Sequence, residues 1–102
     1  MLGGNCRIYA GCNVENASFG LTICAERAAV CRMVCDGERS IQAVAVVCST
    51  GKPTPPCGAC RLVLAEFASE GETLEVCLAA ENGIEIYTLA ELLPHAFKMR
   101  NG

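Results

Sequence analysis

The sequence lacks the features that mark membrane, exported and nucleic-acid-binding proteins. Its longest apolar run, residues 43–48, has six residues, far fewer than the ~20 that a spanning helix needs. The first residues show neither the basic start nor the apolar stretch of an export signal. From residue 66 onward there are seven acidic and two basic residues, whereas polynucleotide-binding proteins present a basic stripe. We therefore expect a cytoplasmic protein that contacts neither membrane nor nucleic acid and acts on a small molecule.

Histidine is scarce and cysteine is abundant. The chain has one histidine, His95, and nine cysteines among 102 residues. The odd number and the absence of an export signal argue against a disulfide framework. Most of the cysteines lie in apolar segments, where free thiols pack as small hydrophobes. A metal site in this chain would therefore take its ligands from cysteine.

The length and composition predict one domain, residues 1–102, that associates with other subunits. A chain of this size has a high ratio of surface to volume. Its residues are nevertheless 52% hydrophobic and only 19% charged. Part of the apolar surface is therefore expected to lie against another subunit.

Strand and helix patterns alternate along the chain, which predicts a layered α/β domain. Alternating apolar residues predict a strand with one buried face over 7–14, and a β-branched run predicts a central strand over 41–48 covered on both faces. Asp36-Gly37 is a stop signal for a helix predicted over 22–35. Thr88 with Glu91 forms a capping-box pattern that opens a last short helix. The remaining patterns predict helices over 22–35 and 57–68 and strands over 74–80 and 84–87.

Three cysteines stand at the starts of two predicted helices. A helix N-terminus carries unpaired N–H groups and partial positive charge, so a cysteine there ionises more easily. Cys57 and Cys60 are three residues apart, which places both sulfurs on one helix face. Cys24 adds a third sulfur from the other helix. Three thiolates leave one position of a tetrahedral zinc open, which is the catalytic arrangement.

Charged residues beside these cysteines suit the same chemistry. Glu26 lies two residues after Cys24, off the ligand face, where its carboxylate can hold a water molecule and carry its proton. Three thiolates on a dication leave a net negative centre. Arg27 and Arg61 are candidates to offset it by hydrogen bonding to the sulfurs, although for either arginine alone an ordinary salt bridge is the commoner role.

Two other interpretations of the cysteine spacing remain open on the residues alone. A Cys-x-x-Cys pair also occurs in thiol-redox proteins and as half of a structural zinc knuckle. The redox interpretation gives no role to Cys24 or Glu26. The structural interpretation requires a fourth ligand, and a lone histidine near the C-terminus is most often simply solvated.

Read together, these segments resemble the cytidine deaminase family. The resemblance rests on the runs Gly11–Arg27 and Pro56–Phe67, and it continues in Glu91–Phe97. It implies a layered α/β/α domain with a mixed central sheet, one Zn²⁺ per chain and a homotetramer with sites built between subunits. It also implies hydrolytic deamination of cytidine or deoxycytidine, within pyrimidine salvage, with a conserved glutamate that is not a zinc ligand.

The resemblance implies roles for individual residues. Cys24, Cys57 and Cys60 correspond to the zinc ligands, and Glu26 to the proton carrier. The remaining positions correspond to substrate contacts: Asn13 and Glu15 to the ribose hydroxyl, Ala25 through its backbone to the base, and Phe97 to a neighbouring subunit's site.

The sequence also departs from the family pattern. The opening helix and first strand of family members, with an aromatic residue that stacks on the pyrimidine, have no counterpart here, and residues 1–4 cannot supply them. Two alternatives to cytidine deamination are therefore kept. One is an aminohydrolase for a related heterocycle, either cytosine or a nucleoside antibiotic. The other is a catalytically impaired, zinc-stabilised assembly protein.

Overall fold

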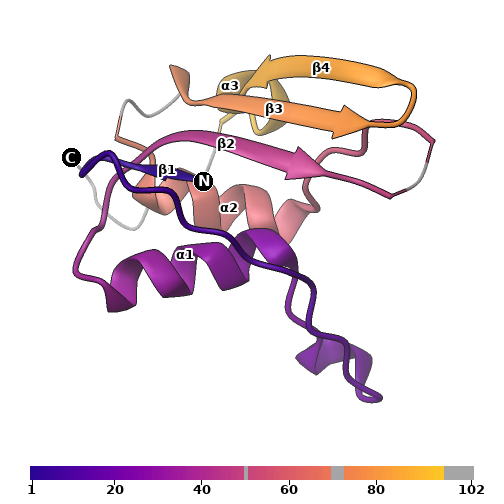
Figure 1. Ribbon diagram of the computed structural model, residues 1–102, viewed down its shortest axis with the longest axis horizontal. Coiled ribbons are helices and arrows are strands. Elements are labelled where there is room, and N and C mark those ends of the chain that lie inside the picture. The colour runs from indigo at the N-terminus through magenta and orange to yellow at the C-terminus, as the bar shows by residue number, and fades with distance from the viewer. Residues whose placement is uncertain (50, 70–72, 96–102) are drawn as a thin grey trace.

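Four strands form one mixed sheet in the order β1-β2-β3-β4 (Figure 1). The computed structural model describes residues 1–49, 51–69 and 73–95. β2 runs parallel to β3, while β1 and β4 run antiparallel to their neighbours. The elements in chain order are β1 (Leu2–Gly3), the 3-10 helix η1 (Phe19–Leu21), α1 (Ala25–Cys35), β2 (Ile41–Val47), α2 (Gly58–Phe67), β3 (Glu75–Ala80), β4 (Gly83–Thr88) and α3 (Leu89–Leu92). The predicted α/β fold with a mixed sheet is confirmed.

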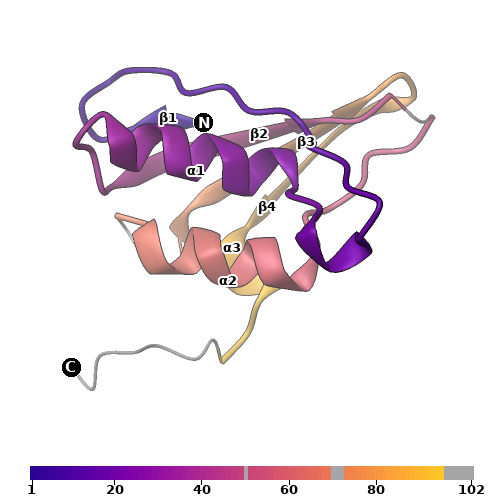
Figure 2. The same cartoon turned by 90° about the horizontal axis from the view of Figure 1, so that it is seen from below.

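Helices α1 and α2 lie side by side on the same face of the sheet (Figures 1 and 2). Each presents a few buried positions spaced three or four residues apart, such as Val30 and Met33 on α1 and Cys60 and Leu64 on α2. The core forms between this face and the sheet. Its largest fully buried side chains are Met33, Ile41, Leu64, Leu74, Val76 and Leu78.

The opposite face of the sheet is open in the described part of the chain. Val47 is 80% exposed on β2, and Ile84 and Ile86 are 68% and 63% exposed on β4. The prediction that 41–48 is covered on both faces is therefore wrong, because Val47 is exposed on the open face. A β-branched run shows that a strand forms, but it does not report what lies on each side of it.

The prediction of a strand over 7–14 is also wrong, and the segment buries Tyr9 instead of the predicted Ile8. Only isolated bridges form there, Leu2 with Ile8 and Val14 with Ile23. Ile8 is 78% exposed, whereas Tyr9 is 5% exposed. The phenol of Tyr9 donates to Asp36 at 2.5 Å and accepts from Asn5 at 2.8 Å. A large ring with a satisfied hydroxyl thus takes the buried position that the alternation assigned to its neighbours.

The helix signals are largely confirmed. α1 ends at Cys35 and is followed by Gly37 at φ 89°, a conformation that glycine adopts without steric cost. The predicted capping box is present, because Thr88 accepts from the Glu91 amide and the Glu91 carboxylate accepts from the Thr88 amide. No helix in the described ranges is long and apolar enough to cross a bilayer.

Candidate functional site

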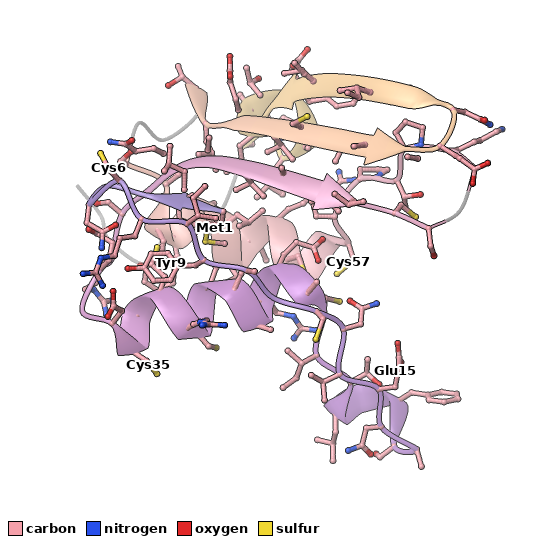
Figure 3. The ribbon with its side chains drawn as sticks, in the orientation of Figure 1. Met1, Cys6, Tyr9, Glu15, Cys35 and Cys57 are labelled. Carbon is pink, nitrogen blue, oxygen red and sulfur yellow. The ribbon has the colours of Figure 1, made fainter. Side chains whose placement is uncertain are left out.

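Each of the two long helices begins at a cysteine. Cys24 is the N-cap residue of α1 and Cys57 is the N-cap residue of α2, and both have extended backbone conformations. α1 therefore begins three residues later than the predicted Thr22, because Ile23 is still extended and pairs with Val14. The starts of the two helices lie at the same end of the fold, where Figure 3 labels Cys57.

Three sulfurs converge at this point. The Sγ atoms of Cys24, Cys57 and Cys60 all lie within 4.8 Å of one another, and those of Cys24 and Cys57 are 3.9 Å apart. Tetrahedral zinc with Zn–S bonds of about 2.3 Å requires sulfurs about 3.8 Å apart. The donor set therefore fits zinc with one coordination position left for water or substrate. The structure thus brings together all three cysteines that the sequence selected.

The thiols of Cys57 and Cys60 have pKa values shifted in opposite directions. A hydrogen bond from the Cys60 backbone N–H lowers the pKa of the Cys57 thiol. Burial raises the pKa of the Cys60 thiol to about 12, and hydrogen bonding to the other two sulfurs and the charge of Glu26 act in the same direction. A bound divalent cation supplies the positive charge that allows all three to ionise together.

Arg27 stands next to the sulfurs and supplies positive charge. Its guanidinium donates to the Thr22 carbonyl at 3.3 Å and to the Cys24 sulfur at 3.6 Å. Hydrogen bonds to the sulfurs of Cys24 and Cys60 raise the pKa of Arg27. Its buried Nε atom has no partner among the described residues. These contacts place the positive charge of Arg27 against the Cys24 sulfur.

Arg61 makes different contacts from those expected. Its Nε donates to the Pro56 carbonyl at 2.7 Å and its Nη1 to the Leu92 carbonyl at 2.6 Å. The expectation that Arg61 donates to the sulfurs is therefore replaced by two hydrogen bonds to backbone oxygens. Spacing in the sequence placed Arg61 near the cysteines, but the partner on α3 is 31 residues away along the chain and left no local signal.

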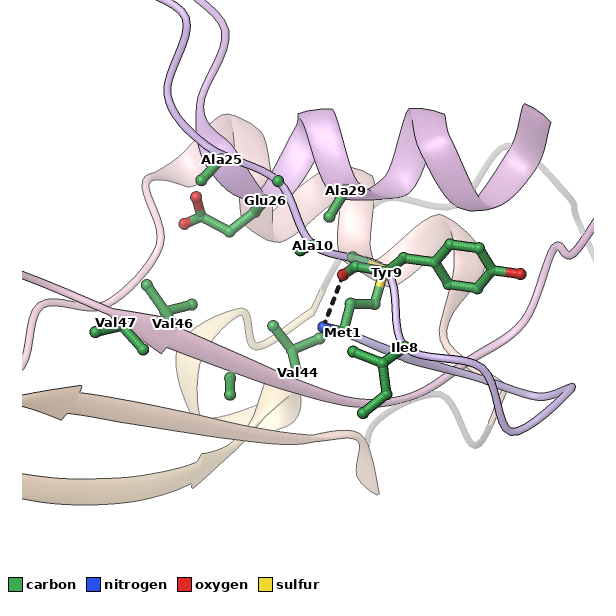
Figure 4. A pocket seen from close by; sticks show the side chains of 12 residues that line it. Met1, Ile8, Tyr9, Ala10, Ala25, Glu26, Ala29, Val44, Val46 and Val47 are labelled. Atoms are coloured by element: carbon green, nitrogen blue, oxygen red, sulfur yellow. Dashed lines mark hydrogen bonds between the residues drawn. The ribbon is translucent and has the colours of Figure 1, made fainter. Parts of the chain in front are cut away.

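Glu26 lies in the first turn of α1 and points into a cavity between α1 and β2 (Figure 4). The cavity has a volume of about 230 Å³ and apolar walls that include Ala10, Ala29, Val44 and Val46. Glu26 lies two residues after Cys24 in the first turn of α1, and its charge contributes to the raised pKa of the Cys60 thiol. An acid that faces an apolar cavity beside a metal site is placed to exchange protons with a bound molecule.

The predicted substrate contacts lie on the segment that enters α1. The Oδ1 atom of Asn13 accepts from the Ala25 backbone N–H at 2.8 Å, so this side chain is fixed against the first turn of α1. Glu15 is exposed on the part of this segment that projects from the fold (Figure 3). Phe97 lies outside the described residues.

Gly11 packs closely against α1, which the sequence patterns did not predict. A Cβ atom at this position would overlap the Ala25 carbonyl oxygen and lie 2.6 Å from the Ala29 backbone nitrogen. The segment that carries Asn13 therefore approaches the helix as closely as backbone atoms permit. The two alanines spaced four residues apart on α1 were the available signal, since small residues on one helix face allow such an approach.

Comparisons with known proteins agree with this site. Residues 1–74 match the family model of the cytidine and deoxycytidylate deaminase zinc-binding region. The chain is 50% identical over 91 residues to the cytidine deaminase of Sporosarcina psychrophila, covering 88% of this chain and 65% of that protein. The corresponding figures for the enzyme of Halalkalibacterium halodurans are 46% over 90 residues, with 88% and 67% covered.

A solved structure gives the same result for the fold. The crystal structure of cytidine deaminase from Burkholderia pseudomallei superposes with a TM-score of 0.84 at 41% identity, covering 94% of this chain and 76% of that one. The chain spans about two thirds of the length of the curated relatives named above. The match to the family model, the sequence identities and the cluster of three sulfurs agree: the chain belongs to the cytidine and deoxycytidylate deaminase zinc-binding family.

Proposed function

We propose that this chain catalyses the zinc-dependent hydrolysis of cytidine or deoxycytidine to uridine or deoxyuridine, with release of ammonia. The observation that carries the proposal is the convergence of three cysteine sulfurs at the starts of two helices, with Glu26 in the first turn of one of them. The relatives named cytidine deaminase support the substrate class. One zinc ion per chain, held by Cys24, Cys57 and Cys60, would supply Lewis-acid activation of a water molecule in its open position.

Glu26 is the proton carrier in this proposal. It accepts the proton that the attacking water loses and passes it to ring N3. It then takes the second proton of that water, from the oxygen now bonded to C4, and delivers it to the leaving amino group. One water is consumed and one ammonia is released, so the carboxylate returns to its starting state. The apolar walls around Glu26 offer few polar groups to screen its charge, which strengthens its interaction with the developing charge on the ring.

The segment before α1 holds the sugar in this proposal. Because the Ala25 N–H requires an acceptor, the Asn13 amide is oriented with Oδ1 toward the helix. Its NH₂ group is then free to donate to a ribose hydroxyl, while Glu15 accepts from one. Ala25 contacts the base through its backbone. Arg27 draws charge from the sulfurs and keeps the metal electrophilic.

The assembly and setting belong to the same proposal. We propose a homotetramer in which Phe97 reaches a neighbouring subunit's site, acting in the cytoplasm in pyrimidine salvage. The exposed apolar residues Val47, Ile84 and Phe19, which is 89% exposed, support association between subunits. Sedimentation of the zinc-loaded protein measures the subunit number, and a monomer at micromolar concentration would overturn this part.

A nucleoside panel with parallel zinc analysis tests the activity. Release of ammonia from cytidine or deoxycytidine, with about one zinc per chain, supports the proposal. Turnover of cytosine without turnover of cytidine would assign the protein to the related aminohydrolases. Zinc at one per chain with no ammonia from any nucleoside would support a zinc-stabilised assembly protein.

A further inference from the structure

The side chain of Arg61 connects two parts of the fold, the turn before α2 and the end of α3. It lies in the first turn of α2, directly after the buried Cys60. One arm of its guanidinium binds the Pro56 carbonyl and another binds the Leu92 carbonyl, at 2.7 and 2.6 Å. Both are charge-assisted hydrogen bonds, which are roughly twice as strong as neutral ones.

The Pro56 contact holds the turn that presents Cys57. Pro56 is fully buried and immediately precedes Cys57, the N-cap residue of α2. A buried carbonyl needs a donor, and the guanidinium of Arg61 supplies it from the same helix. Displacement of this carbonyl would turn the backbone that sets the direction of the Cys57 sulfur.

The Leu92 contact holds the end of α3. Leu92 is the last residue of α3, and the final carbonyls of a helix lack partners within it. A cation at this end also interacts favourably with the helix dipole. α3 is in turn held to the core by Leu89, which is 3% exposed. A shift of α3 would therefore move the Arg61 side chain and, through it, the Pro56 carbonyl before Cys57.

We propose that Arg61 is a positioning residue for the metal centre, which makes zinc retention depend on α3. A lysine cannot replace it, because an ammonium is a compact point charge, whereas the planar guanidinium directs donors to both carbonyls at fixed angles. The inference rests on the proposed zinc site, but it does not require that cytidine be the substrate.

Zinc transfer to a chromophoric chelator tests the inference on the zinc-loaded 102-residue chain. Arg61→Lys and Arg61→Gln are expected to release zinc about 10- to 100-fold faster, the effect typical of losing a group that orients a ligand. Arg32→Gln is the matched control, since Arg32 is exposed in the last turn of α1. Release from both Arg61 variants at the control's rate would overturn the inference.

A second variant separates transmission through α3 from loss of general stability. Thr88→Ala removes the capping box of α3 without touching Arg61. It is expected to speed zinc release in the original chain and to add nothing in the Arg61→Gln background, because coupled residues are not additive. Multiplied effects in the double variant, or destabilised metal-free protein with unchanged zinc release, would overturn the inference. Activity per bound zinc is followed separately, so a failed deamination assay bears only on the proposed function.

Discussion

Replacing Gly11 with alanine tests how closely the substrate segment must approach α1. The added Cβ would overlap the Ala25 carbonyl oxygen and lie 2.6 Å from the Ala29 nitrogen and 3.1 Å from its Cα. All three are backbone atoms, so no flexible side chain can move aside. Real Cβ atoms keep more than 3.0 Å from such neighbours, so the segment or the helix must shift. Overpacking of this kind typically costs about 1–3 kcal/mol.

The shift has a functional consequence as well as an energetic one. Asn13 lies two residues after Gly11, and its 2.8 Å hydrogen bond to the Ala25 N–H fixes the proposed ribose contact. Gly11→Ala is therefore expected to lower the free energy of unfolding in urea by about 1–3 kcal/mol and to raise KM for cytidine more than it lowers kcat. Zinc content should stay at one per chain, because neither Gly11 nor Asn13 belongs to the cluster of three sulfurs.

Gly20→Ala is the matched control for this experiment. A Cβ at Gly20 meets no atom within 4 Å, so stability and KM should stay near those of the original chain. Equal unfolding free energies and equal KM values for Gly11→Ala and Gly20→Ala would refute the packing argument.

Two further predictions concern stability. The hydrogen bond from Tyr9 lowers the pKa of Asp36, so its contribution is present above the aspartate pKa of the unfolded chain and is lost as pH falls through the lower pKa of the folded state. Tyr9→Phe should therefore destabilise the protein at neutral pH, with a difference in urea midpoint that shrinks in acid; a pH-independent difference would contradict this. Met33→Ala, at a position with 0% exposure, should cost about 2–5 kcal/mol, whereas Leu62→Ala, at 46% exposure, should cost far less in the same urea assay.

The local signals in the sequence predicted the frame of the site. Three of these signals depend only on neighbours within four residues: the cysteines at helix starts, the glycine after α1 and the capping box of α3. The structure contains all three. The three sulfurs could be grouped because Cys57 and Cys60 share one helix face and strand–helix alternation brings α1 beside α2.

Contacts between distant residues were beyond the sequence patterns. The burial of Tyr9 depends on Asp36, 27 residues later, so alternation alone chose the wrong face. The partner of Arg61 on α3 likewise depends on how the helices pack. The close approach of Gly11 to α1 is a matter of backbone positions that no periodicity encodes. These features decide how the site is held, while the local signals decide which residues form it.

Glu26→Gln, assayed for zinc and for turnover together, tests the central claim most directly. The amide keeps the shape of the side chain but cannot carry the proton. We expect zinc to remain near one per chain while cytidine turnover falls by at least about 10²–10⁴-fold. Glu66→Gln, at an exposed position on α2, should retain both properties. A Glu26→Gln protein that deaminates cytidine at a near-normal rate would contradict the assignment of the proton carrier, and with it the proposed mechanism.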